Sequence, residues 1–211
     1  MVSGRQTDFN WLEANDVVSK ASISGKNRHN RLDTLLRIVY IPQVTVTWDD
    51  EDQDVRDEAD GWKCVGRKDY YLIFHWLKHN ALVDHVLTVV VDDIADTAPI
   101  SHSDTAIVHC LNGLNIETWN WKKMDISSDV IYRAAKNVKE VYLYCSGNNA
   151  VLRGWSDSAG LVMLKEASRA AKKDCTLRDL LTFLAQNRSR RGQPGISLVH
   201  FTRFGVFFWI C

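Results

Sequence analysis

The feature that most restricts the fold of this chain is a repeated alternation of helix-like and strand-like segments. Ser103 and Asp104 precede the helix-like TAIVHCLNGL, and the strand-like NIETWNW comes after it. Twenty-five residues later, Ser128 and Asp129 precede VIYRAAKNV, which is followed by KEVYLYC. The apolar run LTVVV (87–91) comes before both units and is typical of a strand covered on both faces. This order predicts right-handed crossovers and an α/β fold with a mainly parallel sheet.

The two units also correspond residue by residue at this offset. Asn112 matches Asn137, and Ile116 matches Val141. Each serine is expected to cap its helix, and each aspartate is favourable in the first helical turn. The period lies in the range of leucine-rich repeats, whereas an ordinary three-layer α/β sheet predicts the same strands. The pattern leaves both interpretations open, with repeat-like βα units common to them.

Local patterns predict the remaining elements and a division of the chain. Leucine and valine spacing in 31–40 predicts a helix, and alternation in 44–48 predicts a short strand. Asp69 is expected to cap a buried helix over 70–79, Asn148 or Asn149 can cap the segment after Ser146, and 176–187 is expected to be helical.

The expected divisions are a small helical extension (1–48), an acidic linker (49–65), an α/β domain (66–187) and a basic, then apolar tail (188–211) that could be aberrant. The eight acidic residues within 49–60 predict a solvated linker, with a cation or basic-partner site as the alternative.

Composition narrows the function classes. The 211 residues suffice for one α/β domain or two small ones, and 26 basic residues balance 26 acidic ones. No overall positive field attracts nucleic acid, so no nucleic-acid partner is expected. Five widely spaced cysteines without a CxxC motif, and an N-terminus without an apolar signal region, predict a cytoplasmic protein. The most apolar stretch, 196–211, is too short for a membrane span, which needs roughly 20 residues.

One set of polar residues could carry chemistry at the end of the first parallel strand. Asp92 and Asp93 follow LTVVV directly, and His102 and Asp104 come shortly after. Ligands collect at the carboxyl ends of parallel strands, so these four could form a metal or acid–base site. The alternative is solvation of the strand end and helix capping. No glycine-rich phosphate loop accompanies them, and no cofactor is expected.

Aromatic and histidine pairs give weaker signals. Trp119 and Trp121 lie on the same face of one predicted strand and could form an aromatic platform for a partner, with burial under a helix as the alternative. His75 and His79 share a helix face, but the glutamate of an HExxH zinc motif is missing. No GxSxG nucleophile motif occurs.

Three stretches resemble a known family: HSDTAI (102–107), WNWKKMDISSDVI (119–131) and, most specifically, VYLYCSGNNAVLRGWSD (141–157). They resemble the non-catalytic region that precedes the protease domain in fungal intracellular subtilisin-like proteins. The resemblance covers roughly residues 44–164. The Asp-Ser/Thr-Gly, His-Gly-Thr and Gly-Thr-Ser-x-Ala motifs of a subtilisin-like triad are absent, so the resemblance transfers no catalytic residue.

These observations predict a non-catalytic interaction or regulatory module that holds a protein partner. The candidate binding residues are Asp92, Asp93, His102, Asp104, Trp119, Trp121, Ser146, Asn148 and Asn149. The alternatives are a hydrolase, either metal-assisted at the strand end or with its protease domain elsewhere, and an inactive gene fragment.

Overall fold

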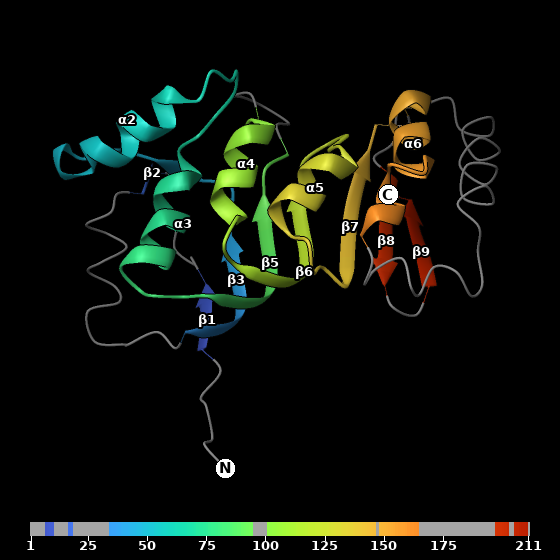
Figure 1. Ribbon diagram of the computed structural model, residues 1–211, viewed down its shortest axis with the longest axis horizontal. Helices are drawn as coiled ribbons and strands as arrows, with labels where there is room; N and C mark the ends of the chain where they lie inside the picture. The colour runs from blue at the N-terminus through green and yellow to red at the C-terminus, as the bar shows by residue number, and fades with distance from the viewer. Residues whose placement is uncertain are drawn as a thin grey trace, which may run out of the picture.

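A seven-stranded, mainly parallel sheet with helices along one face forms the α/β fold of this protein (Figure 1). The computed structural model describes residues 7–10, 17–18, 34–94, 101–146, 148–164, 197–202 and 205–210. The strand order is β1-β3-β5-β6-β7-β8-β9, and β2 pairs with β4 separately. The sheet strands are β1 (Thr7–Asn10), β3 (Leu35–Ile41), β5 (His85–Asp92), β6 (Asn115–Lys122), β7 (Glu140–Cys145), β8 (Ser197–Thr202) and β9 (Gly205–Ile210); the separate pair is β2 (Val17–Val18) and β4 (Thr45–Val46).

The helices connect consecutive parallel strands. Because the strands from β3 to β7 advance in one direction across the sheet, right-handed crossovers place their helices on the same face. Figure 1 shows this helical layer in front of the strands. Its members are η1 (Asp50–Asp52), α2 (Gln53–Gly61), α3 (Tyr70–His79), α4 (Asp104–Leu111) and α5 (Ser128–Ala134), followed by α6 (Asn149–Ser156) and η2 (Leu161–Met163).

The parallel core predicted from the alternation is confirmed. β5, β6 and β7 lie side by side and run in the same direction. The leucine-rich-repeat interpretation is not supported, because paired residues in successive strands are separated by unequal lengths of chain. Leu35 pairs with His85, His85 with Asn115, and Thr118 with Glu140, which gives offsets of 50, 30 and 22 residues. A solenoid needs a nearly constant repeat.

The helix predicted over 31–40 is wrong, because residues 35–41 form β3, a strand within the sheet. The buried positions of β3 are Leu36, Val39 and Ile41, so their spacing is three residues and then two. The first interval imitates a helical period. The same spacing recurs in β5 and in β6, at Val86, Val89, Val91 and at Ile116, Trp119, Trp121.

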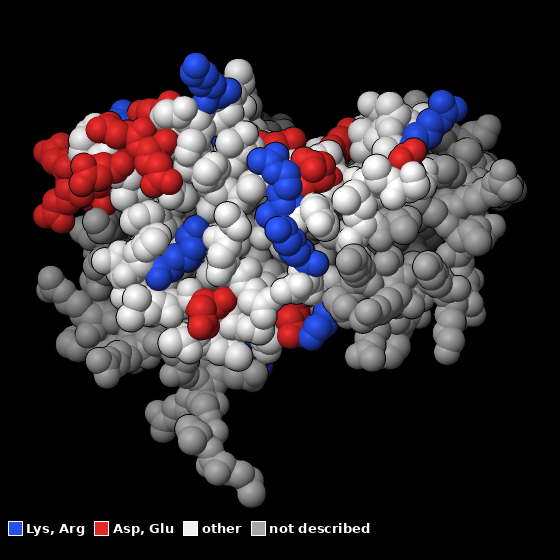
Figure 2. Space-filling model, viewed as in Figure 1, with Lys and Arg blue, Asp and Glu red and all other residues white. Residues whose placement is uncertain are grey.

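The acidic stretch predicted as a solvated linker over 49–65 is largely helical and mostly exposed. Residues 50–61 form η1 and α2, and α2 packs beside α3. The Lys68 ammonium donates to the Ala59 carbonyl over 2.9 Å, and the Tyr71 hydroxyl donates to Glu58 over 2.9 Å. Figure 2 shows the resulting acidic surface over α2, at the left of the view.

The capping predictions were met in part. Ser103 caps α4 by accepting from the Ala106 amide at 3.1 Å, and Asn148 caps α6. The cap of α5 is Ser127 rather than Ser128, which is the first residue of the helix. Asp69 makes no cap hydrogen bond, because its carboxylate has other partners.

The C-terminal strands β8 and β9 add to the sheet beside β7 and are antiparallel to their neighbours. β8 pairs antiparallel with β7, and β9 pairs antiparallel with β8. The strand predicted over 44–48 is reduced to Thr45–Val46. The helix predicted over 176–187 lies outside the described residues. No helix in the described part of the chain has the length and apolarity needed to cross a bilayer.

Candidate functional site

The carboxyl edge of β5 brings together two of the four residues predicted there. Asp93 and His102 are both buried, and the His102 Nδ1 lies 2.9 Å from an Asp93 carboxylate oxygen. The His102 backbone amide also donates to both oxygens of Asp93, over 3.2 and 3.1 Å. Asp92 and Asp104 point to other partners, so the proposed group of four does not form.

The opposite side of the His102 ring meets a carboxylate that the sequence did not single out for this role. His102 Nε2 lies 3.0 Å from Asp69 Oδ1, and Arg67 donates to the same carboxylate over 3.0 and 2.6 Å. The Tyr70 backbone amide also donates to His102 Nε2, over 3.4 Å. We call Arg67, Asp69, His102 and Asp93 the buried charge network.

Aromatic side chains enclose the buried charge network. The Trp121 indole donates to Asp93 Oδ2 over 2.9 Å. The Tyr70 ring stacks on the His102 ring, with centroids 3.9 Å apart, and its hydroxyl donates to the Pro42 carbonyl. Burial raises the pKa of Tyr70 to about 12, so it stays neutral at physiological pH. The network is therefore shielded from water on several sides.

Backbone pairing holds the network together across segments distant in sequence. The Arg67 amide donates to the Ser101 carbonyl over 3.3 Å, and the Ser103 amide donates to the Arg67 carbonyl over 3.0 Å. Gly66 makes this approach possible at a φ of 125°. A Cβ at Gly66 would lie 3.0 Å from both the Ser101 carbonyl oxygen and the Ser103 amide nitrogen. Glycine is thus required both for the backbone conformation and for the space.

The charge on Asp69 makes stability depend on acid pH. Burial raises its pKa, but hydrogen bonds from His102, Arg67 and the Val46 amide outweigh burial and hold it well below its usual range. The unfolded carboxyl, with a pKa of about 3.9, takes up a proton that the folded form does not, so stability falls as pH drops below that value. We expect the unfolding free energy of the wild type to fall more steeply between pH 5 and pH 3 (roughly the window of that pKa) than that of Asp69→Asn, as measured by urea titration. Parallel pH profiles for the two proteins would contradict this assignment.

The geometry argues against a metal-assisted site at this edge. Within the described ranges, no group of three histidine, cysteine, aspartate or glutamate side chains is placed to hold a metal ion. Asp93 and His102 already bind each other and are nearly inaccessible. Asp92 accepts from the Tyr40 hydroxyl over 3.0 Å and pairs with Lys122 at 2.5 Å, while Lys123 binds Asp104 at 2.6 Å.

The aromatic platform proposed at Trp119 and Trp121 is not on the surface. Both side chains are fully buried under the helical layer, which is the alternative that the sequence left open. His75 and His79 do share a helix face, with ring centroids 4.3 Å apart.

The loop after β7 carries the remaining predicted residues, and all three are exposed at the same edge. The Ser146 hydroxyl and amide donate to Asp125, and Asn148 caps α6. Asn149 begins that helix. The side chain of Asn149 is exposed at the surface.

Sequence reasoning missed Arg67 and the true role of Asp69. The available signal was a short run, Gly66-Arg67-Lys68-Asp69, that places a glycine and an opposite charge pair just before an apolar helix. That run does not reveal its partners, because Asp69 and His102 are 33 residues apart. Comparisons with protein-family models, curated proteins and solved structures found no match to this chain.

Proposed function

We propose that this chain is a non-catalytic interaction module that binds a protein partner on the sheet face opposite the helices. The starting observation is that the groups best suited to chemistry, Asp93 and His102, are 3% and 0% exposed. They are used to join β5, β6 and the start of α3. Their burial supports a structural role and leaves partner binding to other surfaces.

The second face of the sheet supplies such a surface. Strand registers align its side chains in rows across β3, β5, β6 and β7. We call this surface the open sheet face, because no helix among the described residues covers it; its residues are Ile38, Tyr40, Thr88, Val90, Asp92, Thr118, Asn120, Lys122, Glu140, Tyr142 and Tyr144. All of them are half-buried except Tyr144, which is buried.

The composition of the open sheet face is the observation that carries the proposal. It presents two half-buried tyrosines, Tyr40 and Tyr142, and tyrosine is enriched in protein interfaces because it combines apolar area with a polar tip. Internal bonds hold several of these side chains in place: Tyr40 donates to Asp92, and Tyr144 donates to Asn120 over 2.7 Å. Such preorganisation lowers the entropy lost on binding. Asp92 and Lys122 remain 27% and 30% exposed, so they can also meet a partner.

Site-specific photo-crosslinking tests this proposal. A photoreactive amino acid at Thr88, in the middle of the open sheet face, should capture a specific protein from a lysate of the source cells. The same group at exposed Arg153, on α6, serves as the control and should not capture it. The captured protein should then bind Thr88→Arg roughly tenfold or more weakly than wild type, because a central interface position commonly contributes above ~1 kcal/mol.

Three outcomes would contradict the interaction module. One is that neither position captures any protein reproducibly. The second is that the Arg153 position captures the same protein as the Thr88 position. The third is that Thr88→Arg leaves the affinity for that protein unchanged. Circular dichroism of each variant separates a lost interface from a lost fold.

The proposed setting of this module is ahead of a subtilisin-like protease domain, and it rests only on the resemblance of residues 102–107, 119–131 and 141–157. The genomic sequence downstream of this reading frame is its test. An in-frame series of the three subtilisin-like triad motifs would support the setting, and their absence would remove it without affecting the interaction module.

A further inference from the structure

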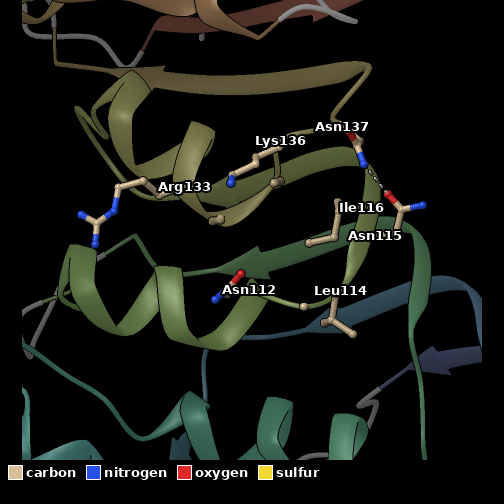
Figure 3. A pocket seen from close by; sticks show the side chains of 10 residues that line it. Asn112, Leu114, Asn115, Ile116, Arg133, Lys136 and Asn137 are labelled. Carbon is tan, nitrogen blue, oxygen red and sulfur yellow. Dashed lines mark hydrogen bonds between the residues drawn. The ribbon is translucent and has the colours of Figure 1, made fainter.

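A second surface lies at the opposite, amino edge of the parallel strands. The loop after α4, the start of β6 and the loop after α5 enclose a shallow pocket of about 270 Å³ (Figure 3). Its polar lining comes from Arg133, Lys136, Asn112, Asn115 and Asn137. Asn112 and Asn137 are the residues that correspond at the 25-residue offset, so the two similar units contribute equivalent loop positions.

The lining of this amino-edge pocket is positively charged. It contains two cations and no carboxylate. Arg133 pairs with Asp129 at 3.6 Å, and both are largely exposed. Lys136, in contrast, forms no salt bridge with any residue that the structure describes. The space-filling view shows both basic and acidic side chains over the α4–α5 region (Figure 2).

The side chains of Asn112 and Lys136 make no hydrogen bond or salt bridge with the described residues, so both can donate to a ligand in the pocket. Asn115 is already occupied, because it bonds Asn137 over 3.3 Å and His85 over 3.0 Å. Asn112 and Lys136 lie on opposite sides of the opening, with their polar ends facing the space between the two loops (Figure 3). One amide N–H and one ammonium can each donate to one oxygen of a carboxylate.

The C-terminal ends of two helices oppose a phosphate more strongly than they oppose a single negative charge. α4 and α5 both end at this pocket, and helix C-termini carry partial negative charge, which opposes a dianion more strongly than a monoanion. On α4 this charge is offset, because the Lys78 ammonium donates to the carbonyls of His109 and Asn112 over 2.8 and 3.3 Å.

The size and openness of the pocket favour a peptide side chain. Its volume falls below the roughly 300–1,000 Å³ typical of pockets for cofactors and drug-sized ligands. Its polar lining residues are exposed, so a free small acid would stay largely in water. A peptide can place one carboxylate between the two donors and continue across the surface. We propose that the amino-edge pocket binds an aspartate or glutamate side chain of an extended acidic peptide, through Lys136 and Asn112.

NMR titration of the full chain, labelled with ¹⁵N, tests this proposal with a hexaglutamate peptide as the probe. Saturable shifts should appear at residues 112–116 and 133–137. Lys136→Gln combined with Asn112→Ala should weaken binding by about tenfold, which is ~1.4 kcal/mol shared between two exposed polar contacts. Lys139→Gln is the matched control, because Lys139 is a nearby exposed cation that pairs with Glu117 outside the pocket.

Two further probes, hexaglutamine and glutarate, and the affinities of the variants can each contradict the proposal. Hexaglutamine should cause no shifts at the pocket, and glutarate should bind at least tenfold more weakly than hexaglutamate. Equal binding of hexaglutamine would exclude carboxylate recognition, and equal binding of glutarate would exclude a peptide site. Unchanged affinity in the double variant, or an equal loss in Lys139→Gln, would exclude Lys136 and Asn112 as the contacts. Because the open sheet face is elsewhere, none of these results depends on the interaction module.

Discussion

Replacing His102 with leucine is expected to lower the free energy of unfolding by about 3–5 kcal/mol, the usual effect of leaving a buried charged group without its partner. The side chain is fully buried, and its two ring nitrogens lie 2.9 and 3.0 Å from Asp93 and Asp69. Leucine would leave the buried Asp93 carboxylate without its ring partner and would remove the ring contact of Asp69. The expected loss is therefore mainly the cost of uncompensated charge.

Urea unfolding followed by circular dichroism measures this effect, with His79→Leu as the control. His79 is exposed at the end of α3, so its replacement should change stability by less than about 0.5 kcal/mol. A loss below about 1 kcal/mol for His102→Leu would show that the buried charge network contributes little to the fold.

Trp121→Phe is expected to cost about 1.5–3 kcal/mol more than Trp119→Phe, which is the contribution of a hydrogen bond to a charged group. The two tryptophans are neighbours on β6 and are both fully buried, so the change in apolar volume is the same. Trp121 donates to the Asp93 carboxylate over 2.9 Å. The indole nitrogen of Trp119 is buried and has no acceptor among the described residues.

This pair of substitutions separates the hydrogen bond from the loss of packing. Both variants are measured by urea unfolding under the same conditions, and the difference between them is the informative quantity. Equal losses would mean that the indole of Trp121 contributes by volume alone, and that Asp93 is satisfied by the His102 amide and ring.

The central fold could be predicted because its signals are local. α3 begins and ends at the predicted residues, since an apolar run of that length between polar residues specifies a buried helix. β5, β6 and β7 follow from apolar strands that alternate with capped helices. β3 was not recognised, because two buried residues three apart, Leu36 and Val39, imitate the period of a helix.

The candidate sites depended on contacts that no local pattern encodes. The proximity of Asp93 and His102 was predictable from parallel strand topology, which brings chemistry-bearing residues to one edge. The position of Asp69 was not, because the capping pattern assigned its carboxylate to the helix backbone. The amino-edge pocket left one trace in the sequence, the correspondence of Asn112 and Asn137, whose meaning depends on how the two loops meet.

The reactivity of Cys110, in α4, can be used to follow the opening of the helical layer. Its side chain is fully buried between the helical layer and the sheet, and burial raises the pKa of the thiol. Alkylating reagents attack the thiolate, so this sulfur stays inert while α4 remains seated. The rate at which iodoacetamide alkylates Cys110, measured as the mass gain of the peptide that contains it, therefore reports how often α4 separates from the sheet. The measurement needs no added probe on the protein.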